Sequence, residues 1–362
     1  MKFFLMTWIF LSVFLPVVAF ADVCLNPDLG KTPVLAQGRV MPLLTHARIF
    51  RSTALNKKQC KNLSDVALYC YLSLGQRAKI ENPGGGDSAN QGNLSGGDCK
   101  IEMMAEHKQL RALLGIDSGP DAKGHFVSPE VVLSKKFELE NDYRRLEAAK
   151  ELETGYGVGV SNLAHGISFY EKVVSGNDWM VLKGSEWVPI ASMKENSDFE
   201  NTIMASTALL PADQSKAISY EVIYEKTRIF YSVAFVCLLA FLFSLIGLTR
   251  EAWYRAAVVG SVVVLAIEVV GMILRSLISG RAPVTNMFET VMWTGFGVLT
   301  LSVLMSIKMK ERKILVTGLV FNLIALFMMN FATTMFDGTI RPLVPVLRDN
   351  FWLSTHVTTV TL

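Results

Sequence analysis

The stretch "IFYSVAFVCLLAFLFSLIGL", residues 229–248, runs for twenty positions without a charged side chain. A helix needs about 20 mainly apolar residues to cross the hydrocarbon core of a bilayer, so these residues predict a membrane-spanning helix. The stretch also marks a change in composition, because the apolar excess of the chain is concentrated after residue 228. The chain is therefore predicted to have two parts, a water-soluble one and then a membrane domain over residues 229–362.

Three further apolar stretches follow the first, and each is long enough to cross a bilayer. They lie at about residues 256–278, 287–307 and 313–335. Between the last two, "KMKERK" (308–313) carries four basic residues, and short basic loops of this kind stay on the cytoplasmic side. Counting back from this loop, the residues before 229 are expected outside the membrane. Counting forward, the chain after the fourth span is expected there too.

A last apolar run, "FWLSTHVTTVTL" (351–362), has twelve residues. Twelve helical residues cover about 18 Å of a core of roughly 30 Å, so the run predicts only the start of a fifth span. The topology places His356 about one turn inside the outer face of the membrane. An imidazole there can ligate a metal or haem iron, or it can be an interfacial side chain that water satisfies, and the residues alone leave both interpretations open.

The N-terminal stretch, residues 1–21, has Lys2, an apolar run and "AFA" at its end, with small residues where a signal peptidase reads them. It is predicted to be an export signal removed after Ala21, with a retained membrane anchor as the alternative. Residues 22–228 then form a mixed, mainly helical periplasmic domain of about 200 residues, a usual size for one domain. The predicted fold is mainly α, in a multi-pass membrane protein.

Local patterns subdivide the periplasmic domain. Residues 82–98 are rich in Gly, Asn and Ser and predict a flexible loop, without the glycine spacing of a phosphate cradle. Residues 137–153 have helical spacing, and residues 178–190 hold two β-prone runs that predict a hairpin. Residues 29–51, punctuated by Gly and Pro, predict an irregular leader that runs into a helix.

The cysteines suggest an oxidising compartment. Four of the five fall in the exported part: Cys24, Cys60, Cys70 and Cys99. An even number there predicts up to two disulfides with three connectivities open, and four unpaired thiols are the alternative. The absence of a CxxC pair argues against a thiol–disulfide oxidoreductase and against a zinc ribbon.

Two ionisable residues fall inside the second predicted span. A carboxylate at mid-bilayer is costly, so Glu268 is expected to face the protein interior and to have a role or a partner. A neutral, protonated Glu268 packed between helices is the alternative. Arg275 lies seven residues further on, about 10 Å along the helix, which is too far for direct pairing.

The external loop "SGRAPVTNMFET", residues 279–290, also combines charged and capping residues. Its Gly and Pro283 break the helix, Asn286 can cap the next one, and Glu289 lies in that helix's first turn, where a negative charge suits the dipole. This account explains the residue types. It does not explain why Arg281, Asn286 and Glu289 occur together.

Other kinds of chemistry have little support. The remaining histidines are isolated, without HExxH spacing, and are predicted to be surface residues: His46, His107, His125 and His165. No Ser/His/Asp arrangement indicates a hydrolase. The net charge of +3, without a basic cluster on the soluble part, argues against a nucleic-acid partner.

Three segments resemble one family. "LISGRAPVTNMFETVMW" (277–293) resembles the signature SGR-x-P-x-x-N-x-[YF]-E of CcsA/ResC-type membrane proteins of cytochrome c biogenesis. "NFWLSTHVTTVTL" (350–362) is similar to the N-W-L-x-x-H-V start of that family's next helix. Residues 29–51 are similar to the leader G-K-x-P-V-x-x-x-G-R-x-x-P-L-x-T-x-A-R of its long forms, which have an N-terminal exported domain. The resemblance covers residues 29–51 and most of 229–362.

The resemblance implies a location and a function. The location is a bacterial inner (cytoplasmic) membrane, with the N-terminal domain in the periplasm. Proteins of this family hold haem at the outer surface of the inner membrane, ligate its iron with histidines and present its vinyl groups to the CxxCH thiols of an apocytochrome. It makes His356 one of two external axial ligands of a transient b-type haem, with no metal beyond the haem iron. The expected partners are the lipid bilayer, apocytochrome c and a ResB/CcsB-type protein. As an enzyme the chain is at most a component of a cytochrome c synthase (haem lyase).

The sequence also departs from the family. The tryptophan-rich segment WGxxWxWD, which follows the matched histidine in the family, has no counterpart here, so a truncated or split form is expected, with that segment supplied elsewhere. Relatives often have His where Glu268 stands, and no ligand role passes to this carboxylate. Two hypotheses remain as alternatives: a membrane-anchored periplasmic sensor or scaffold, and a transporter piece with a proton-coupled Glu268, although no inverted repeat is apparent.

Overall fold

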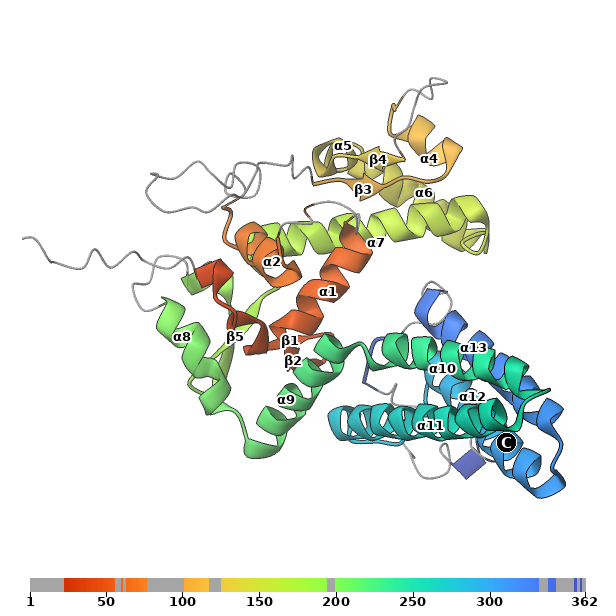
Figure 1. Cartoon of the computed structure of the whole chain (residues 1–362). Coiled ribbons are helices and arrows are strands. Elements are labelled where there is room, and N and C mark those ends of the chain that lie inside the picture. Colours follow the sequence, from red (N-terminus) through yellow and green to blue (C-terminus); the bar gives the residue numbers. More distant parts are fainter. Residues whose placement is uncertain are drawn as a thin grey trace, which may run out of the picture.

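The computed structural model describes residues 23–55, 60, 63–76, 101–116, 125–193, 199–331, 338–342, 355, 356 and 359. The predicted signal peptide, the loop 82–98, Cys99 and most of the last apolar run lie outside these described residues. The described chain is mainly helical, as predicted. It has an N-terminal part, which extends to residue 227, and a bundle of four long helices (Figure 1).

The N-terminal part begins with a hairpin and two helices. Strands β1 (Pro33–Ala36) and β2 (Arg39–Pro42) pair antiparallel, and helices α1 (Leu43–Ala54) and α2 (Asp65–Ser73) follow. The expectation of an irregular leader is therefore wrong for residues 33–42. A two-residue turn joins the strands, because Gln37 and Gly38 both adopt positive φ, the conformation that tight hairpin turns require.

The middle of the N-terminal part is built around helix α7 (Gly155–Ser175). Its buried face includes Val160, Leu163 and Ile167, and it packs against α1, α2 and α6 (Lys136–Ala148). The helix predicted at 137–153 is thus confirmed as α6, although it ends earlier, where Lys150 turns to a positive φ. Short elements complete this region: β3 (Met103–Met104), α4 (Lys108–Leu113), β4 (Phe126–Val127) and α5 (Pro129–Ser134).

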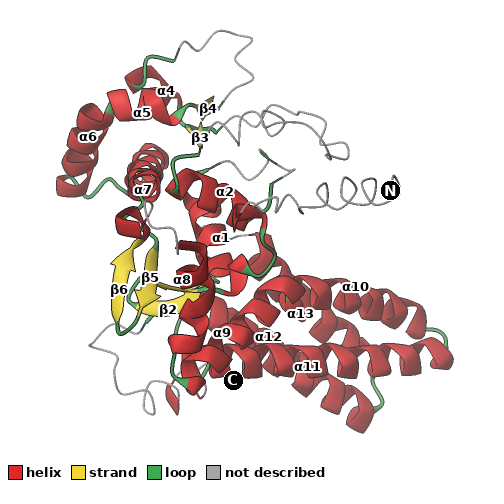
Figure 2. Cartoon of the chain, turned by 90° about the vertical axis from the view of Figure 1, so that its left-hand side faces the viewer, coloured by secondary structure: helices red, strands yellow, loops and turns green. Residues whose placement is uncertain are grey.

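The hairpin predicted at 178–190 is confirmed as β5 (Met180–Lys183) and β6 (Glu186–Pro189), which pair antiparallel. It is followed by α8 (Phe199–Ala205) and α9 (Ala212–Thr227). Figures 1 and 2 show α9 at the junction, between the N-terminal part and the four long helices. At Arg228 the backbone adopts a positive φ, and the first long helix begins at the next residue.

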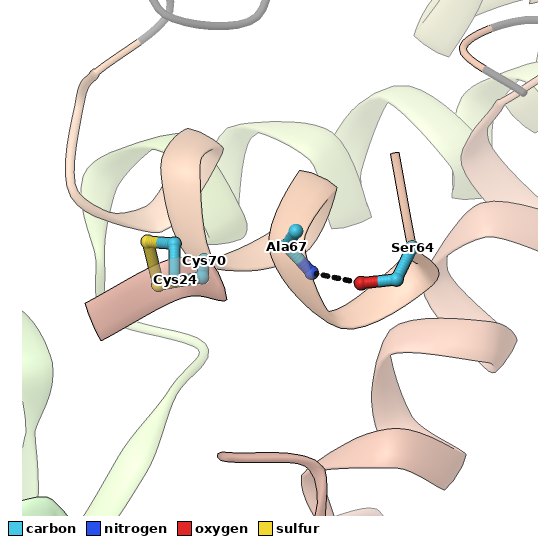
Figure 3. The surroundings of a disulfide bond; sticks show 4 residues. All are labelled: Cys24, Ser64, Ala67 and Cys70. Carbon is cyan, nitrogen blue, oxygen red and sulfur yellow. Dashed lines mark hydrogen bonds between the residues drawn. A yellow bond between two sulfur atoms is a disulfide. The ribbon is translucent and has the colours of Figure 1, made fainter. Parts of the chain in front are cut away.

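A disulfide joins Cys24 to Cys70, with 5.5 Å between their Cα atoms (Figure 3). The pair ties the start of the described chain to α2, whose first turn is capped by the Ser64 hydroxyl accepting from the Ala67 N–H. Cys60 is disulfide-bonded as well, and Cys237 is a free, buried thiol. The sequence left three connectivities open. Among the described residues, the structure pairs Cys24 with Cys70.

Four helices form the bundle, and their lengths and apolarity are sufficient to cross a membrane. They are α10 (Ile229–Gly247), α11 (Glu251–Ser279), α12 (Met287–Met309) and α13 (Arg312–Phe331). The four helices predicted from the apolar stretches are confirmed, with α11 beginning five residues earlier than expected. Large apolar side chains cover the outward faces, among them Phe235, Val259, Leu301 and Phe327. A lipid environment accounts for this exposure, since water-soluble proteins rarely expose so many large apolar side chains on neighbouring helices.

Candidate functional site

The central feature of the junction is a buried ion pair between α11 and α12. Arg275, near the end of α11, is 0% exposed, and Glu289 lies in the first turn of α12. The Nη2 and Nε atoms of Arg275 lie 2.9 and 3.2 Å from Oε1 of Glu289. The second oxygen of Glu289 accepts from the backbone N–H and the hydroxyl of Thr285, both at 2.8 Å. This explains why the two charges occur together, because a buried charge is tolerated when it is paired and hydrogen-bonded.

The loop between α11 and α12 has the local structure expected from its sequence. Gly280 ends α11 with a φ of +68°, and its N–H donates to the Ser276 carbonyl at 2.8 Å. The Asn286 side-chain oxygen accepts from the Glu289 N–H at 2.8 Å, so the predicted cap is confirmed. Pro283 lies half-buried between these two ends. The loop therefore fixes the first turn of α12, and with it the position of the Glu289 carboxylate.

Arg275 also reaches beyond α11 and α12. Its Nη1 atom donates to the Tyr224 hydroxyl on α9 at 2.9 Å and to the Gly338 carbonyl at 3.0 Å. Its guanidinium carbon lies 4.8 Å from the centre of the Phe288 ring, within the range of a cation–π contact. Burial raises the pKa of the Tyr224 phenol, although the nearby Arg275 opposes the shift. One side chain thus connects three helices with the segment 338–342.

Two more arginines hold the same segment. The Arg39 Nε donates to the Ile340 carbonyl at 2.8 Å, and the Arg281 Nη2 donates to the Arg341 carbonyl at 2.7 Å. We call these two residues together with Arg275 the arginine clamp. Charge-assisted hydrogen bonds of this kind are stronger than those between neutral groups. The clamp also explains Arg281, the member of the external loop for which the sequence offered no reason.

Helix α9 joins the N-terminal part to the clamp. The two Nη atoms of Arg39 lie 2.7 and 2.8 Å from the two carboxylate oxygens of Glu221, which is buried. One turn further along α9, Glu225 pairs with Arg48 of α1 at 2.7 Å. Glu221 and Glu225 therefore both pair with arginines of residues 29–51. Of these two arginines, only Arg39 belongs to the clamp.

His356 lies beyond the segment 338–342, in a helical turn, and its side chain is exposed. An exposed imidazole can be reached by a group from outside the chain, and its ring nitrogen can bind a metal. A complete haem site needs a second ligand and an apolar enclosure. Among the described residues, no group of three His, Cys, Asp or Glu side chains could hold a metal ion. Within the described part of the chain, His356 is thus not a member of a metal-ligating group.

Glu268 is buried in the middle of the bundle. Its Oε1 accepts a hydrogen bond from the Asn322 side chain of α13 at 2.9 Å, and the Cys237 sulfur of α10 lies 3.9 Å from the same amide nitrogen. Its second oxygen has no hydrogen-bond partner within the described part of the chain. Arg275 pairs with Glu289 instead, in agreement with the distance argument. The partner of Glu268 is thus a neutral amide on another helix.

Replacing Asn322 with leucine is expected to destabilise the bundle by about 1–3 kcal/mol, because the Glu268 carboxyl loses its hydrogen-bond donor while it stays buried. Replacing both Asn322 and Glu268 with leucine removes the polar pair and is expected to recover most of this loss. Unfolding in mixed detergent micelles measures both variants. A single variant as stable as the native protein would contradict a stabilising role for this hydrogen bond.

The histidines of the N-terminal part divide into two kinds. His46 is 1% exposed, so its prediction as a surface residue is wrong: its Nε2 lies 2.6 Å from the Asp178 carboxylate, which also accepts from the Tyr69 hydroxyl at 2.8 Å. Burial, and then the charge of Asp178, raise the pKa of Tyr69 well above its usual value. His125 and His165 are exposed as predicted, and His107 is half-buried.

Sequence reasoning missed several members of the site: Tyr224, Glu221, Arg39 and Asn322. Arg39 carried a signal, because it stands inside the leader that resembles the family. Asn322 carried another, since a polar side chain in the middle of a span needs a partner. Tyr224 and Glu221 lie in α9, a helix of mixed polar and apolar residues, and nothing in their surroundings in the sequence distinguishes them.

The apolar helices and the polar junction define a multi-pass helical membrane protein with a large N-terminal part held against one end of its bundle. Comparison with models of known families and with characterised proteins found no match.

Proposed function

We propose that this chain is a membrane subunit of cytochrome c assembly that holds haem at the outer face of a bacterial inner membrane for attachment to the CxxCH thiols of apocytochrome c. His356 is one axial ligand of the iron. When bound, haem supplies the vinyl groups to which the thiols add. In this role the chain is at most one component of a cytochrome c synthase, together with a ResB/CcsB-type partner or a segment that provides the second ligand and the tryptophan-rich surface.

One observation carries the proposal. Arg39 belongs to the leader and Arg281 to the external loop, two regions far apart in the sequence that resemble the same family. Their side chains hold the neighbouring carbonyls of Ile340 and Arg341. In the sequence, residues 340 and 341 precede His356 by about fifteen positions, and His356 belongs to the third region of resemblance. Two of the three regions of resemblance thus meet at the segment 338–342, which precedes the third in the sequence.

The charges at the two ends of the bundle support the proposed orientation. Basic residues concentrate at the end away from the N-terminal part: Arg250, Lys308, Lys310, Arg312 and Lys313. Such residues are retained on the cytoplasmic side. The N-terminal part and the arginine clamp then lie in the periplasm, where apocytochrome arrives. An oxidising periplasm also suits the Cys24–Cys70 disulfide.

Each part of the chain has a role in the proposed reaction. The His356 ring nitrogen binds the iron, and the arginine clamp holds the segment that leads to this histidine. Within the clamp, Arg275 also pairs with the buried Glu289 and so joins α11 to α12. None of these residues needs to gain or lose a proton in the reaction, so their contribution is to bind and to orient.

Replacing His356 with glycine is expected to abolish the Soret absorbance of the purified protein when it is co-expressed with a segment carrying WGxxWxWD. Added imidazole is expected to restore the band, because a free imidazole can occupy the position of the missing ring. The matched control is His165→Gly, which removes an exposed histidine of the N-terminal part and should leave the band unchanged.

A sensor or scaffold without haem chemistry makes the opposite prediction. In that case the native protein shows no Soret band, and the His356 variant supports cytochrome maturation as well as the native protein does. Either result would overturn the haem assignment.

A further inference from the structure

The segment 338–342 has no helix or strand of its own in the structure. Three of its backbone carbonyls, at Gly338, Ile340 and Arg341, instead accept hydrogen bonds from the arginine clamp. The Ile340 side chain is buried as well. The course of this segment is therefore set by side chains of other elements. Replacing one of these side chains should change the position or the mobility of the segment near the lost hydrogen bond.

The members of the clamp come from different parts of the protein. Arg275 belongs to α11 and Arg281 to the loop after it, so both are parts of the bundle. Arg39 is the first residue of β2, in the N-terminal part. Arg39 is thus the member of the clamp that links the N-terminal part to the segment, through its hydrogen bond to the Ile340 carbonyl.

Arg39 is itself held firmly. Its two Nη atoms are engaged by the two oxygens of Glu221, whose side chain is 3% exposed, and its Nε is left for Ile340. A bidentate arginine–carboxylate pair fixes the plane of the guanidinium group as well as its position. The donor direction toward the Ile340 carbonyl is thus set by α9.

The hairpin that carries Arg39 meets the segment at a second point. A Cβ atom at Gly38 would lie 3.6 Å from Cγ of Pro342, so the turn is in van der Waals range of the segment. Gly38 has a φ of +77°, which favours glycine at this position. The turn and the arginine beside it therefore form one contact surface for residues 340–342.

We propose that Arg39 is a positioning residue. It ties the N-terminal part to the segment 338–342 and so fixes the position from which the chain continues toward His356. The anchoring of the segment follows from the contacts alone. Its consequence for haem ligation rests on the proposed function.

The anchoring can be tested by thiol labelling of the full-length protein in detergent. An Ile340→Cys substitution introduces a buried thiol into the segment, and a maleimide probe reports how often the segment opens. The background is low among the described cysteines, because Cys24, Cys60 and Cys70 are disulfide-bonded and Cys237 is buried. In this background, Arg39→Lys is expected to raise the labelling rate about tenfold or more, since lysine keeps the charge beside Glu221 but has no guanidinium fork.

The matched control is Arg48→Lys. Arg48 also pairs with a carboxylate of α9, Glu225, but it makes no hydrogen bond to the segment 338–342 among the described contacts. Its labelling rate should stay within about twofold of the parent, because the segment does not depend on it. A second test variant, Arg39→Met with Glu221→Leu, removes the buried pair as a whole and should also raise labelling, without leaving a charge unpaired.

The outcomes separate the anchoring from the haem function. Labelling that rises with both Arg39 variants and not with Arg48→Lys supports the proposal. Labelling that is unchanged, or that rises equally in the control, overturns it. In the haem-loaded assembly, Arg39→Lys is also expected to shift or weaken the Soret band. If labelling rises while the band is unaffected, Arg39 still anchors the segment, and the dependence of haem ligation on this anchoring is what fails.

Discussion

Replacing Arg275 with methionine is expected to destabilise the protein by about 3–5 kcal/mol, a larger loss than that expected from replacing Asn322. The change leaves Glu289, which is 1% exposed, as a buried charge with its principal partner removed. The hydrogen bonds to Tyr224 and to the Gly338 carbonyl disappear at the same time. Unfolding of the purified protein in mixed micelles, followed by tryptophan fluorescence, measures the loss.

The control for this prediction removes both charges. In Arg275→Met combined with Glu289→Gln, the neutral amide oxygen can still accept from Thr285, so no buried charge remains. Most of the lost stability should return, because replacing a whole buried ion pair is often close to neutral. Equal destabilisation in the single and double variants would show that packing of Arg275, and not its charge, holds the helices together.

Replacing Cys24 and Cys70 together with serine is expected to destabilise the N-terminal part by about 4 kcal/mol. The disulfide joins residues that are 46 positions apart, so its removal restores many conformations to the unfolded chain. In the folded state Cys70 lies on α2, and both cysteines belong to the core of the N-terminal part. Urea unfolding under non-reducing conditions, followed by proteolysis of that part, measures the effect.

Cys237→Ala provides the comparison. This thiol is free and buried within the bundle, so its loss should leave the unfolding of the N-terminal part unchanged. If the double serine variant is as stable as the native protein, the Cys24–Cys70 bond does not stabilise the fold.

Some features of the site follow from short stretches of sequence. The cap on α12 needs only Asn286 three residues before Glu289, and the hairpin of β5 and β6 needs two β-prone runs around a turn. Both predictions are confirmed, because neighbouring residues supply all the interactions involved. The leader was harder to interpret, since its hairpin depends on two positive φ angles, and only one of them belongs to a glycine.

His46 shows the opposite case. On its own a histidine in an amphipathic helix gives no sign of burial, and the prediction of a surface position was wrong. Its partner Asp178 lies far along the chain, at the start of another hairpin, and Tyr69 reaches the same carboxylate from α2. Only the packing of α1 against α2 and α7 brings these groups together.

The sequence by itself determined the four apolar helices between residues 229 and 331, because their length and apolarity can be compared directly with the thickness of a bilayer. It also determined that the buried charges need partners, since an unpaired charge in hydrocarbon is too costly. Which partner each charge has was decided only by the tertiary structure. Arg275 meets Glu289, Glu268 meets Asn322, and Arg39 meets Glu221 and the Ile340 carbonyl. Most of these contacts join elements far apart in the chain, and the order of residues within each element does not specify which helices lie side by side.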